Sequence, residues 1–343
     1  MPSTSWGWTT MASGLLEVAG VIDPGQFWPA GTADADTTRI TVDVEAGAFT
    51  FRAHPGAPSQ VTRAFDNATV VGHTRKAAID IQGIDAPELH YRPQSAITVR
   101  QGRTKAQTKA YLALNEDYRQ HLGETATVNL TRFLRQAGQN PLSCVVSSAV
   151  DEPDEVFDTY GRFVGAIALA IGGQKESLNT WLLRAGWAFP AFYNSMSKNE
   201  ITALTDVANE AWSGDRGVWP LQNDYAKDFD WKLVFRRPSK NPAVDAQADR
   251  GPVLFPKLFR RLSTWAVNKK AGMVTGTFHA YLKKNKDELF VADDFIAQGP
   301  AAETRTLDEF VDSDGFFSLW PEQAVFKEKP STLLGPGGAP VTW

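Results

Sequence analysis

Charged side chains that could act together occur in three short motifs, which lie far apart in the chain. They read Asp34-Ala35-Asp36-Thr37, Gly83-Ile84-Asp85-Ala86-Pro87-Glu88 and Asp158-Thr159-Tyr160-Gly161-Arg162. Carboxylates can ligate a hard cation or accept a proton, and a guanidinium can hold a phosphate. Each motif alone is weak evidence, because an acid at the end of a strand is more often a turn or cap residue.

Strands and helices predicted from the apolar pattern must position these three motifs. Alternation of apolar residues predicts a strand from Asp36 and another around Ile79-Asp80-Ile81. Apolar runs predict strands over 142–150 and 162–171, and helical spacing predicts helices over 104–121, 125–137, 178–185 and 200–213. Residues 45–75, with a second β-rich stretch at 69–72, are expected to form a long hairpin or an inserted loop.

In this order, with a helix between the second and third, the three motifs resemble the staphylococcal nuclease family. The segment 182–188, Leu-Leu-Arg-Ala-Gly-Trp-Ala, is similar to the helix-Gly-x-Ala segment of that family. Ala-Asn-Glu-Ala at 208–211, followed by Arg-Gly-Val-Trp at 216–219, is similar to its closing helix. The resemblance covers about residues 31–220. It implies a five-stranded, partly open barrel of the oligonucleotide-binding type with packed helices, an α+β fold that is mainly β.

The resemblance also implies roles for individual residues. Asp36 and Asp85 would bind a divalent cation together with the backbone carbonyl of Ala86, most simply Ca²⁺, with Mg²⁺ or Mn²⁺ as alternatives. Glu88 would act as general base towards the attacking water. Asp34 would help to orient the metal ligands without binding the cation itself.

Substrate binding is assigned in the same way. Arg162 would hold the scissile phosphate of DNA or RNA, in relatives a single strand cut at its 5′-oxygen to leave a 3′-phosphate; its alternative is an ordinary surface arginine. Tyr160 and Tyr193 are the candidate contacts to the nucleotide.

Asp80 departs from the family pattern, which usually has an arginine there. A carboxylate about 4 Å from a bound phosphate would be repelled by about 4 kcal/mol at an effective dielectric constant of about 20. Asp80 could be a further oxygen around the metal, a basic residue such as Arg75 or Lys76 could replace the missing guanidinium, or catalysis could be impaired. The third alternative leaves a module that binds nucleic acid or a protein partner without cleaving.

Composition bounds the remaining expectations. A length of 343 residues favours two units, which we place at 31–222 for the nuclease-like domain and 223–343 for a smaller α+β domain, with residues 1–30 as an N-terminal arm. The formal net charge of −4 argues against a protein that coats nucleic acid nonspecifically. Cys144 is the single cysteine, and no signal peptide or membrane span is recognisable, so a cytoplasmic location is the default expectation.

The C-terminal region has a strong charge pattern. Residues 232–286 carry thirteen Lys or Arg against two acids, and residues 287–328 carry eleven acids against two basic residues. The basic stretch could follow a nucleic-acid backbone, or it could pair with the acidic stretch, which we prefer. The region could also recruit a protein partner. We expect a linker at 238–252, a helix at 257–270, strands at 274–282, 288–292 and 316–320, and a flexible tail at Leu-Gly-Pro-Gly-Gly-Ala-Pro.

Overall fold

The fold is taken from a computed structural model. It describes residues 14–42, 49–53, 57, 60–62, 76–93, 103–150, 153–158, 160–226, 230–235 and 251–328. The β-rich stretch at 69–72, the linker expected at 238–252, the C-terminal tail and the side chains of Arg75 and Lys76 lie outside the described part.

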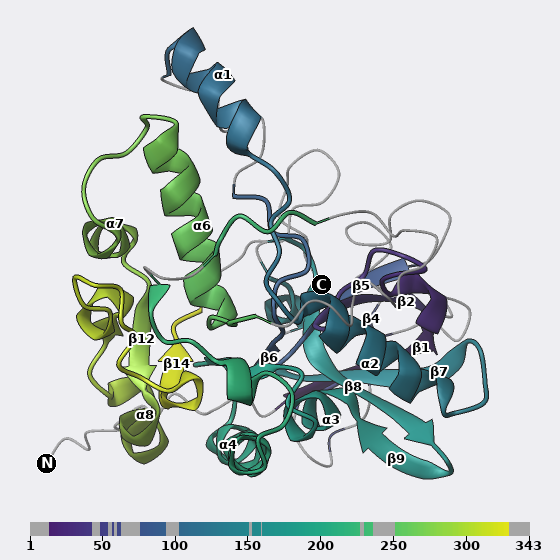
Figure 1. The fold of residues 1–343 in the computed structure, drawn as a ribbon. Coiled ribbons are helices and arrows are strands. Elements are labelled where there is room, and N and C mark those ends of the chain that lie inside the picture. Colours follow the sequence, from purple (N-terminus) through teal and green to yellow (C-terminus); the bar gives the residue numbers. More distant parts are fainter. Residues whose placement is uncertain are drawn as a thin grey trace, which may run out of the picture.

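Five strands form a closed barrel (Figure 1). They are β1 (Gly14–Ile22), β2 (Thr37–Val42), β5 (Lys76–Ile81), β7 (Leu142–Val150) and β8 (Phe163–Ile171). β1 pairs with both β7 and β2, β2 pairs with β5, and β5 pairs in parallel with β8, which returns to β7. Buried side chains alternate along β7 and β8, as expected for strands with one face in a core. The expected mainly β fold of the oligonucleotide-binding type is confirmed.

Residues 14–30 are not part of a separate arm as we expected, because β1 is an integral strand of the barrel. All nine of its residues pair with β7, from Gly14 opposite Val150 to Ile22 opposite Leu142. Glu17 and Gly20 interrupt the apolar pattern and hid this strand from the sequence analysis. Since β1 joins β7 to β2, the barrel is closed and not partly open.

Three further strands extend the barrel sheet: β3 (Phe49–Arg52), β4 (Gln60–Thr62) and β9 (Gln174–Ser177). β3 and β4 are antiparallel and pair through β3 with β1, which fits the hairpin expected within residues 45–75. Three two-residue strands lie near the motifs: β6 (Ile84–Asp85) and β10 (Phe189–Pro190), which pair with each other, and β11 (Phe192–Tyr193).

The helices α2 (Gly123–Arg135), α3 (Leu178–Arg184) and α4 (Lys198–Ser213) lie around the barrel, whereas α1 (Lys105–Leu114) stands away from it and contacts α6 (Pro256–Lys270) (Figure 1). Capping boxes begin α1 at Thr104 and α4 at Ser197. α1 ends earlier than expected, because Tyr118 leaves the helical pattern to bridge Tyr91. Short 3₁₀ turns are η1 (Pro24–Gln26), η5 (Pro153–Val156), η6 (Trp219–Leu221), η8 (Gly299–Ala301), η9 (Leu307–Phe310) and η10 (Pro321–Gln323).

The C-terminal region combines helices with a small sheet. Its elements are α6 (Pro256–Lys270), α7 (Phe278–Asn285), β12 (Glu288–Val291), α8 (Ala292–Gln298), β13 (Arg305–Thr306) and β14 (Ala324–Phe326). The strand expected at 274–282 is wrong, because Thr277 caps a helix there whose Phe278 and Leu282 are buried on one face. The stretch 316–320 forms only isolated bridges, at Phe316 and Phe317.

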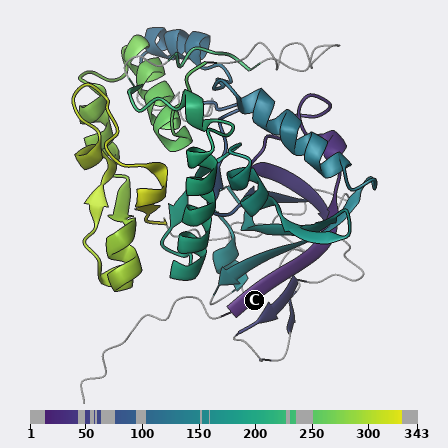
Figure 2. The ribbon, with the colours of Figure 1, turned by 60° about the horizontal axis from the view of Figure 1, so that its bottom comes forward.

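The C-terminal region is joined to the barrel region by a shared sheet and a shared core. β11, which follows α3, pairs in parallel with β14. Phe255, just before α6, contacts Phe189 from one region and Phe317 from the other, and all three belong to one hydrophobic cluster. Figure 2 shows α3 and α4 between the barrel strands and the C-terminal elements. In the described part of the chain, no helix is long and apolar enough to cross a membrane.

Candidate active site

One cavity of about 500 Å³ brings the three motifs together. Its lining includes every charged side chain that the sequence analysis assigned to the site, and both tyrosines: Asp34, Asp36, Asp80, Asp85, Glu88, Arg162, Tyr160 and Tyr193. The barrel supplies one wall, and α6 supplies another through Lys257, Arg260 and Arg261. Four groups that are far apart in the chain, two metal-type carboxylates, a candidate base and a guanidinium, therefore face one space.

The first motif lies at the start of β2. An oxygen of Asp34 accepts a hydrogen bond from the Thr37 backbone at 3.0 Å, which fixes the turn into the strand. An oxygen of Asp36 accepts one from the Ala86 backbone at 2.7 Å. The second contact ties the first motif to the second across the opening of the barrel.

The second motif leaves β6 as a loop that is packed against α2. A Cβ at Gly123 would lie 2.7 Å from the backbone oxygen of Glu88, so only glycine allows α2 to approach the loop this closely. The Glu88 backbone N–H donates to the side-chain oxygen of Gln120 at 3.0 Å. Gln120 is completely buried and also donates to the backbone oxygen of Leu254 at 2.6 Å. The loop that carries Glu88 is thus braced by both regions of the chain.

Arg162 is held by three neighbours. Its Nε donates to Asp158 at 2.6 Å, Nη1 to the Thr37 hydroxyl at 2.8 Å and Nη2 to Asp80 at 2.9 Å. The register places Asp80 and Arg162 close together. Ile79 of β5 lies opposite Phe163 of β8, and Asp80 and Arg162 directly adjoin this pair. Asp80 therefore pairs directly with the guanidinium that was expected to bind phosphate.

Arg260 of α6 contacts the second motif. Its guanidinium donates to both oxygens of Asp85, at 3.0 Å and 2.7 Å, and to Glu88 at 2.5 Å. Such a forked contact is the strong form of an arginine–carboxylate pair. The sequence analysis did not identify Arg260, because nothing in its neighbourhood in sequence points to a partner 175 residues away.

Crowding of acids changes the protonation of the cavity. Burial raises the pKa of Asp34 well above its ordinary value, and the nearby charges of Asp36 and Glu88 raise it further. Burial and Asp85 raise the pKa of Asp36, and burial raises that of Glu88 to about 7 although Arg260 opposes the shift. Burial likewise raises the pKa of Asp80 to about 7 against the effect of Arg162. Burial is the largest cause of all four shifts, so the cavity favours the protonated acids unless a positive charge stabilises the carboxylates.

The chemistry of these donors fits a hard divalent cation, since carboxylate oxygens are its preferred ligands and a bound cation would stabilise their ionised form. As they stand, however, no three His, Cys, Asp or Glu side chains in the described residues form a group that could hold a metal ion. Both Asp85 oxygens are engaged by Arg260. A cation at Asp85 would therefore compete with the guanidinium.

A comparison with family models matches residues 78–220 to the staphylococcal nuclease homologue family. This segment contains two of the three motifs, and it runs from β5 to the turn after α4. The chain contains a staphylococcal nuclease-like domain. Asp34, Asp36 and the strands β1 and β2 precede the matched segment, yet they complete its barrel and its cavity. No curated protein matches the chain.

The two tyrosines of the nuclease-like domain differ in exposure. Tyr160 is 83% exposed, and its ring lies 5.5 Å from the Arg162 guanidinium carbon. Tyr193 is partly buried, and burial raises its pKa. Tyr160 is therefore placed to meet an incoming ligand at the edge of the cavity, and Tyr193 deeper inside.

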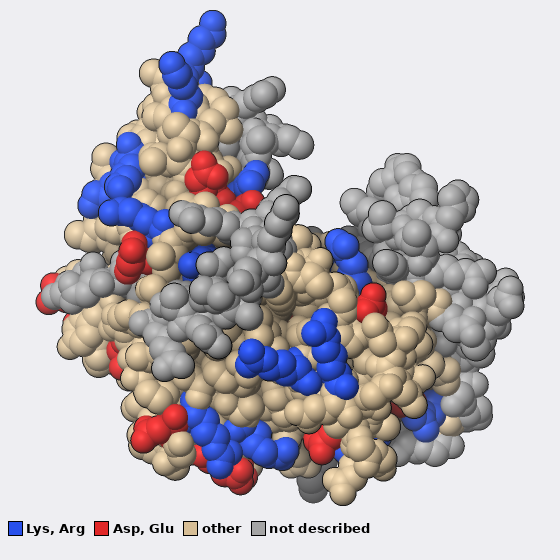
Figure 3. Space-filling view, turned by 45° about the vertical axis from the view of Figure 1, so that its right-hand side comes forward, with Lys and Arg blue, Asp and Glu red and all other residues tan. Residues whose placement is uncertain are grey.

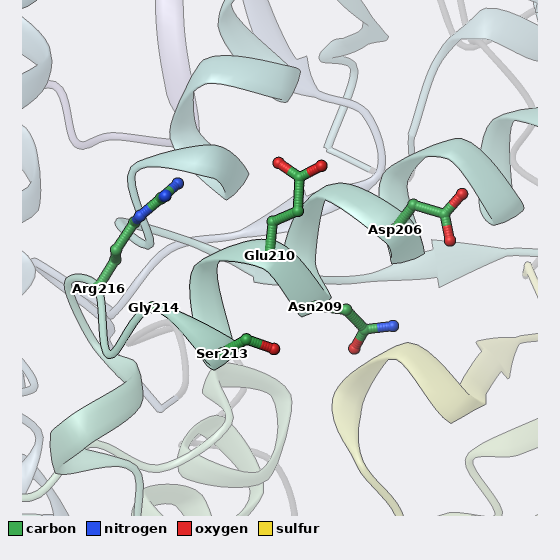
Figure 4. Close-up of a pocket in the computed structure, with 6 residues that line it drawn as sticks. All are labelled: Asp206, Asn209, Glu210, Ser213, Gly214 and Arg216. Carbon is green, nitrogen blue, oxygen red and sulfur yellow. The ribbon is translucent and has the colours of Figure 1, made fainter.

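A second hollow of the nuclease-like domain lies elsewhere, on the outer face of α4 (Figure 4). It is lined by Asp206, Asn209, Glu210, Ser213, Gly214 and Arg216. Figure 4 shows Asp206, Asn209, Glu210 and Ser213 along the helix, with Gly214 and Arg216 on the segment that follows it. Arg216 donates to the backbone oxygen of Arg184, a helix-end contact. This hollow shares no residue with the motifs, and we assign it no role.

Proposed function

We propose that the protein is a metal-dependent nuclease that hydrolyses phosphodiester bonds in DNA or RNA, preferentially single-stranded. The observation that carries this proposal is the meeting of Asp36, Asp85, Glu88 and Arg162 on one cavity, in a chain with a nuclease-like domain. Asp36, Asp85 and the Ala86 carbonyl would hold the cation, most simply Ca²⁺. When bound, the cation would stabilise the charge on the phosphoryl oxygens.

The protein's own groups account for the remaining steps. Glu88 accepts the proton of the attacking water, a role suited to a carboxyl whose pKa lies near neutral pH. The water oxygen forms a bond to phosphorus, the bond from phosphorus to the 5′-oxygen breaks, and that oxygen takes a proton from solvent. Arg162 lies where it can hold the phosphoryl oxygens, and a guanidinium there stabilises the charge of the transition state.

A catalytically impaired module that binds nucleic acid is the second candidate. The pairing of Asp80 with Arg162 favours it, because the carboxylate occupies one donor and repels a phosphate. Release of Arg260 from Glu88 is also needed before that carboxylate can face water.

Incubation with labelled single-stranded DNA and RNA separates the two candidates. Each substrate is tested with Ca²⁺, Mg²⁺, Mn²⁺ or a chelator, and binding is followed by fluorescence anisotropy in parallel. Cleavage with at least one ion, abolished by the chelator, supports the nuclease. Binding without cleavage under every condition supports the impaired module.

A further inference from the structure

The wall that α6 contributes to the cavity carries three cations, and only two of them are paired with acids. Lys257, Arg260 and Arg261 follow one another at the spacing that places side chains on one helix face. Arg261 is engaged by Asp287 through two hydrogen bonds of 2.5 Å, and Arg260 by Asp85 and Glu88. Within the described residues, Lys257 has no hydrogen-bonding or ion-pair partner.

The surroundings of Lys257 make its charge costly. Its ammonium nitrogen lies 3.9 Å from the centre of the Phe326 ring and 5.4 Å from that of Tyr193. It stands in the first turn of α6, where the helix dipole disfavours a cation. Burial, and to a smaller extent the charges of Arg260 and Arg261, lower its pKa to about 8, although Asp287 and Asp85 oppose the shift. Among the described residues, the acids nearest to Lys257 act on it only through their charge and form no ion pair with it.

Arg162 cannot supply this charge alone. Three acceptors already engage its Nε, Nη1 and Nη2, and two of them are carboxylates. A polyanion that enters the cavity would meet five carboxylates on the barrel side. Its binding therefore needs a cation on a different wall of the cavity. Of the described cations that line the cavity, Lys257 is the one whose donors are not engaged by an acid.

We infer that Lys257, with Arg260 one turn later, forms a phosphate-binding face through which the C-terminal region completes the nucleic-acid site. The inference rests on the nucleic-acid binding contained in the proposed function. The occupant is the phosphodiester backbone of a single strand, which lies between the carboxylates of the barrel and the basic face of α6. The rings of Tyr193 and Phe326 position the lysine.

The distribution of other charges supports a local contact. Figure 3 shows one side of the molecule, on which the described Lys and Arg side chains lie in separate groups with acidic side chains between them. This side has no continuous basic path for a nucleic-acid backbone, which agrees with affinity that comes from a few placed cations. Lys257 is such a placed cation, since it lines the cavity itself.

The test measures how binding of a short, fluorescein-labelled single-stranded DNA depends on salt. Binding is measured by anisotropy with Ca²⁺ in a Glu88→Gln background, so that cleavage cannot consume the probe. Lys257→Gln should weaken binding about 3- to 10-fold and reduce the slope of log K against log salt by about 0.7, the value for one phosphate contact of a single strand. Lys257→Arg should keep most of the affinity and the slope.

Lys269→Gln is the matched control. Lys269 lies on the same helix and over an aromatic ring, Trp265 at 4.5 Å, but does not line the cavity. Its loss should leave affinity and slope unchanged, and thermal unfolding should show that all variants are folded. Unchanged affinity and slope in Lys257→Gln would overturn the inference even if the native protein cleaves DNA. Binding that depends on Lys257, without cleavage by the native protein, would instead overturn the proposed hydrolysis and leave the inference standing.

Discussion

The guanidinium of Arg260 bridges Asp85 and Glu88, with both Asp85 oxygens accepting its hydrogen bonds at 3.0 Å and 2.7 Å. A residue of the C-terminal region thus neutralises a candidate metal ligand and the candidate general base of the nuclease-like domain. The side chains of Asp85 and Glu88 are 9% and 14% exposed, so losing this partner has consequences.

Replacing Arg260 by Gln should therefore change how the protein responds to metal ions. Without the guanidinium of Arg260, the two buried carboxylates repel each other. We therefore expect the free energy of unfolding, measured in the presence of chelator, to fall by about 1–3 kcal/mol. Calcium should then restore stability, since it no longer competes with an arginine for Asp85. Thermal unfolding with and without Ca²⁺ measures both effects; an increase in melting temperature with Ca²⁺ no larger than in the native protein would contradict the competition.

Asp80 and Asp158 both contact Arg162, yet they should have opposite effects when neutralised. Asp80→Asn removes a carboxylate that repels phosphate, while Asp158 and Thr37 still hold the guanidinium, so kcat/KM should rise about 3- to 10-fold above pH 7. Asp158→Asn keeps one oxygen but loses the carboxylate that receives Arg162 Nε, and activity should fall.

The two variants remove the same charge and serve as controls for each other. Steady-state cleavage of labelled single-stranded DNA compares them. Equal changes in both would show that overall charge, and not the placement of Arg162, determines the rate.

Gly123 should be intolerant of any side chain. Gly123→Ala would place a methyl group 2.7 Å from the Glu88 backbone oxygen and 2.9 Å from that of Pro87, so the loop or α2 must shift. We expect lower activity together with a loss of about 1–3 kcal/mol in the free energy of unfolding. Arg132→Ala, an exposed change on the same helix, is the control. Native stability and activity in Gly123→Ala would contradict the close packing.

Cys144 should be inert in the folded protein. Burial in the barrel raises the pKa of its thiol from 9.0 to about 12, so little thiolate is present at neutral pH. A thiol-reactive dye at pH 8 should label the protein only after denaturation. Because the folded pKa is raised, this group's contribution to stability is complete below pH 9 and is lost as the pH rises from 9 to 12. Rapid labelling of native protein would contradict the burial.

The parts of the site that sequence could predict are those that lie in contiguous motifs. Asp36, Asp85, Glu88 and Arg162 sit at the ends of short strands, and local patterns placed those strands within a few residues. Their convergence follows from closing the barrel, which brings the start of β2 and the loop after β6 together. The resemblance to a known family implied that these residues meet in one site, but with a partly open barrel, whereas β1 closes it.

The contributions of the C-terminal region could not be predicted in this way. Arg260 and Gln120 act through tertiary contacts, and β11 pairs with β14 by joining Phe192 to Val325, which no local pattern indicates. The one available signal was the spacing of Lys257, Arg260 and Arg261 on a predicted helix. We preferred to pair that basic stretch with the acidic one, and Arg261 does pair with Asp287, but Arg260 faces the barrel.

The central claim is that Glu88 accepts a proton from water within this cavity. The most direct measurement is the rate at which purified native protein and Glu88→Gln cleave labelled single-stranded DNA at saturating divalent ion. We predict that the native protein cleaves and that Glu88→Gln loses about 10²- to 10⁴-fold in rate while still binding the DNA. Equal rates for the two proteins would contradict the account.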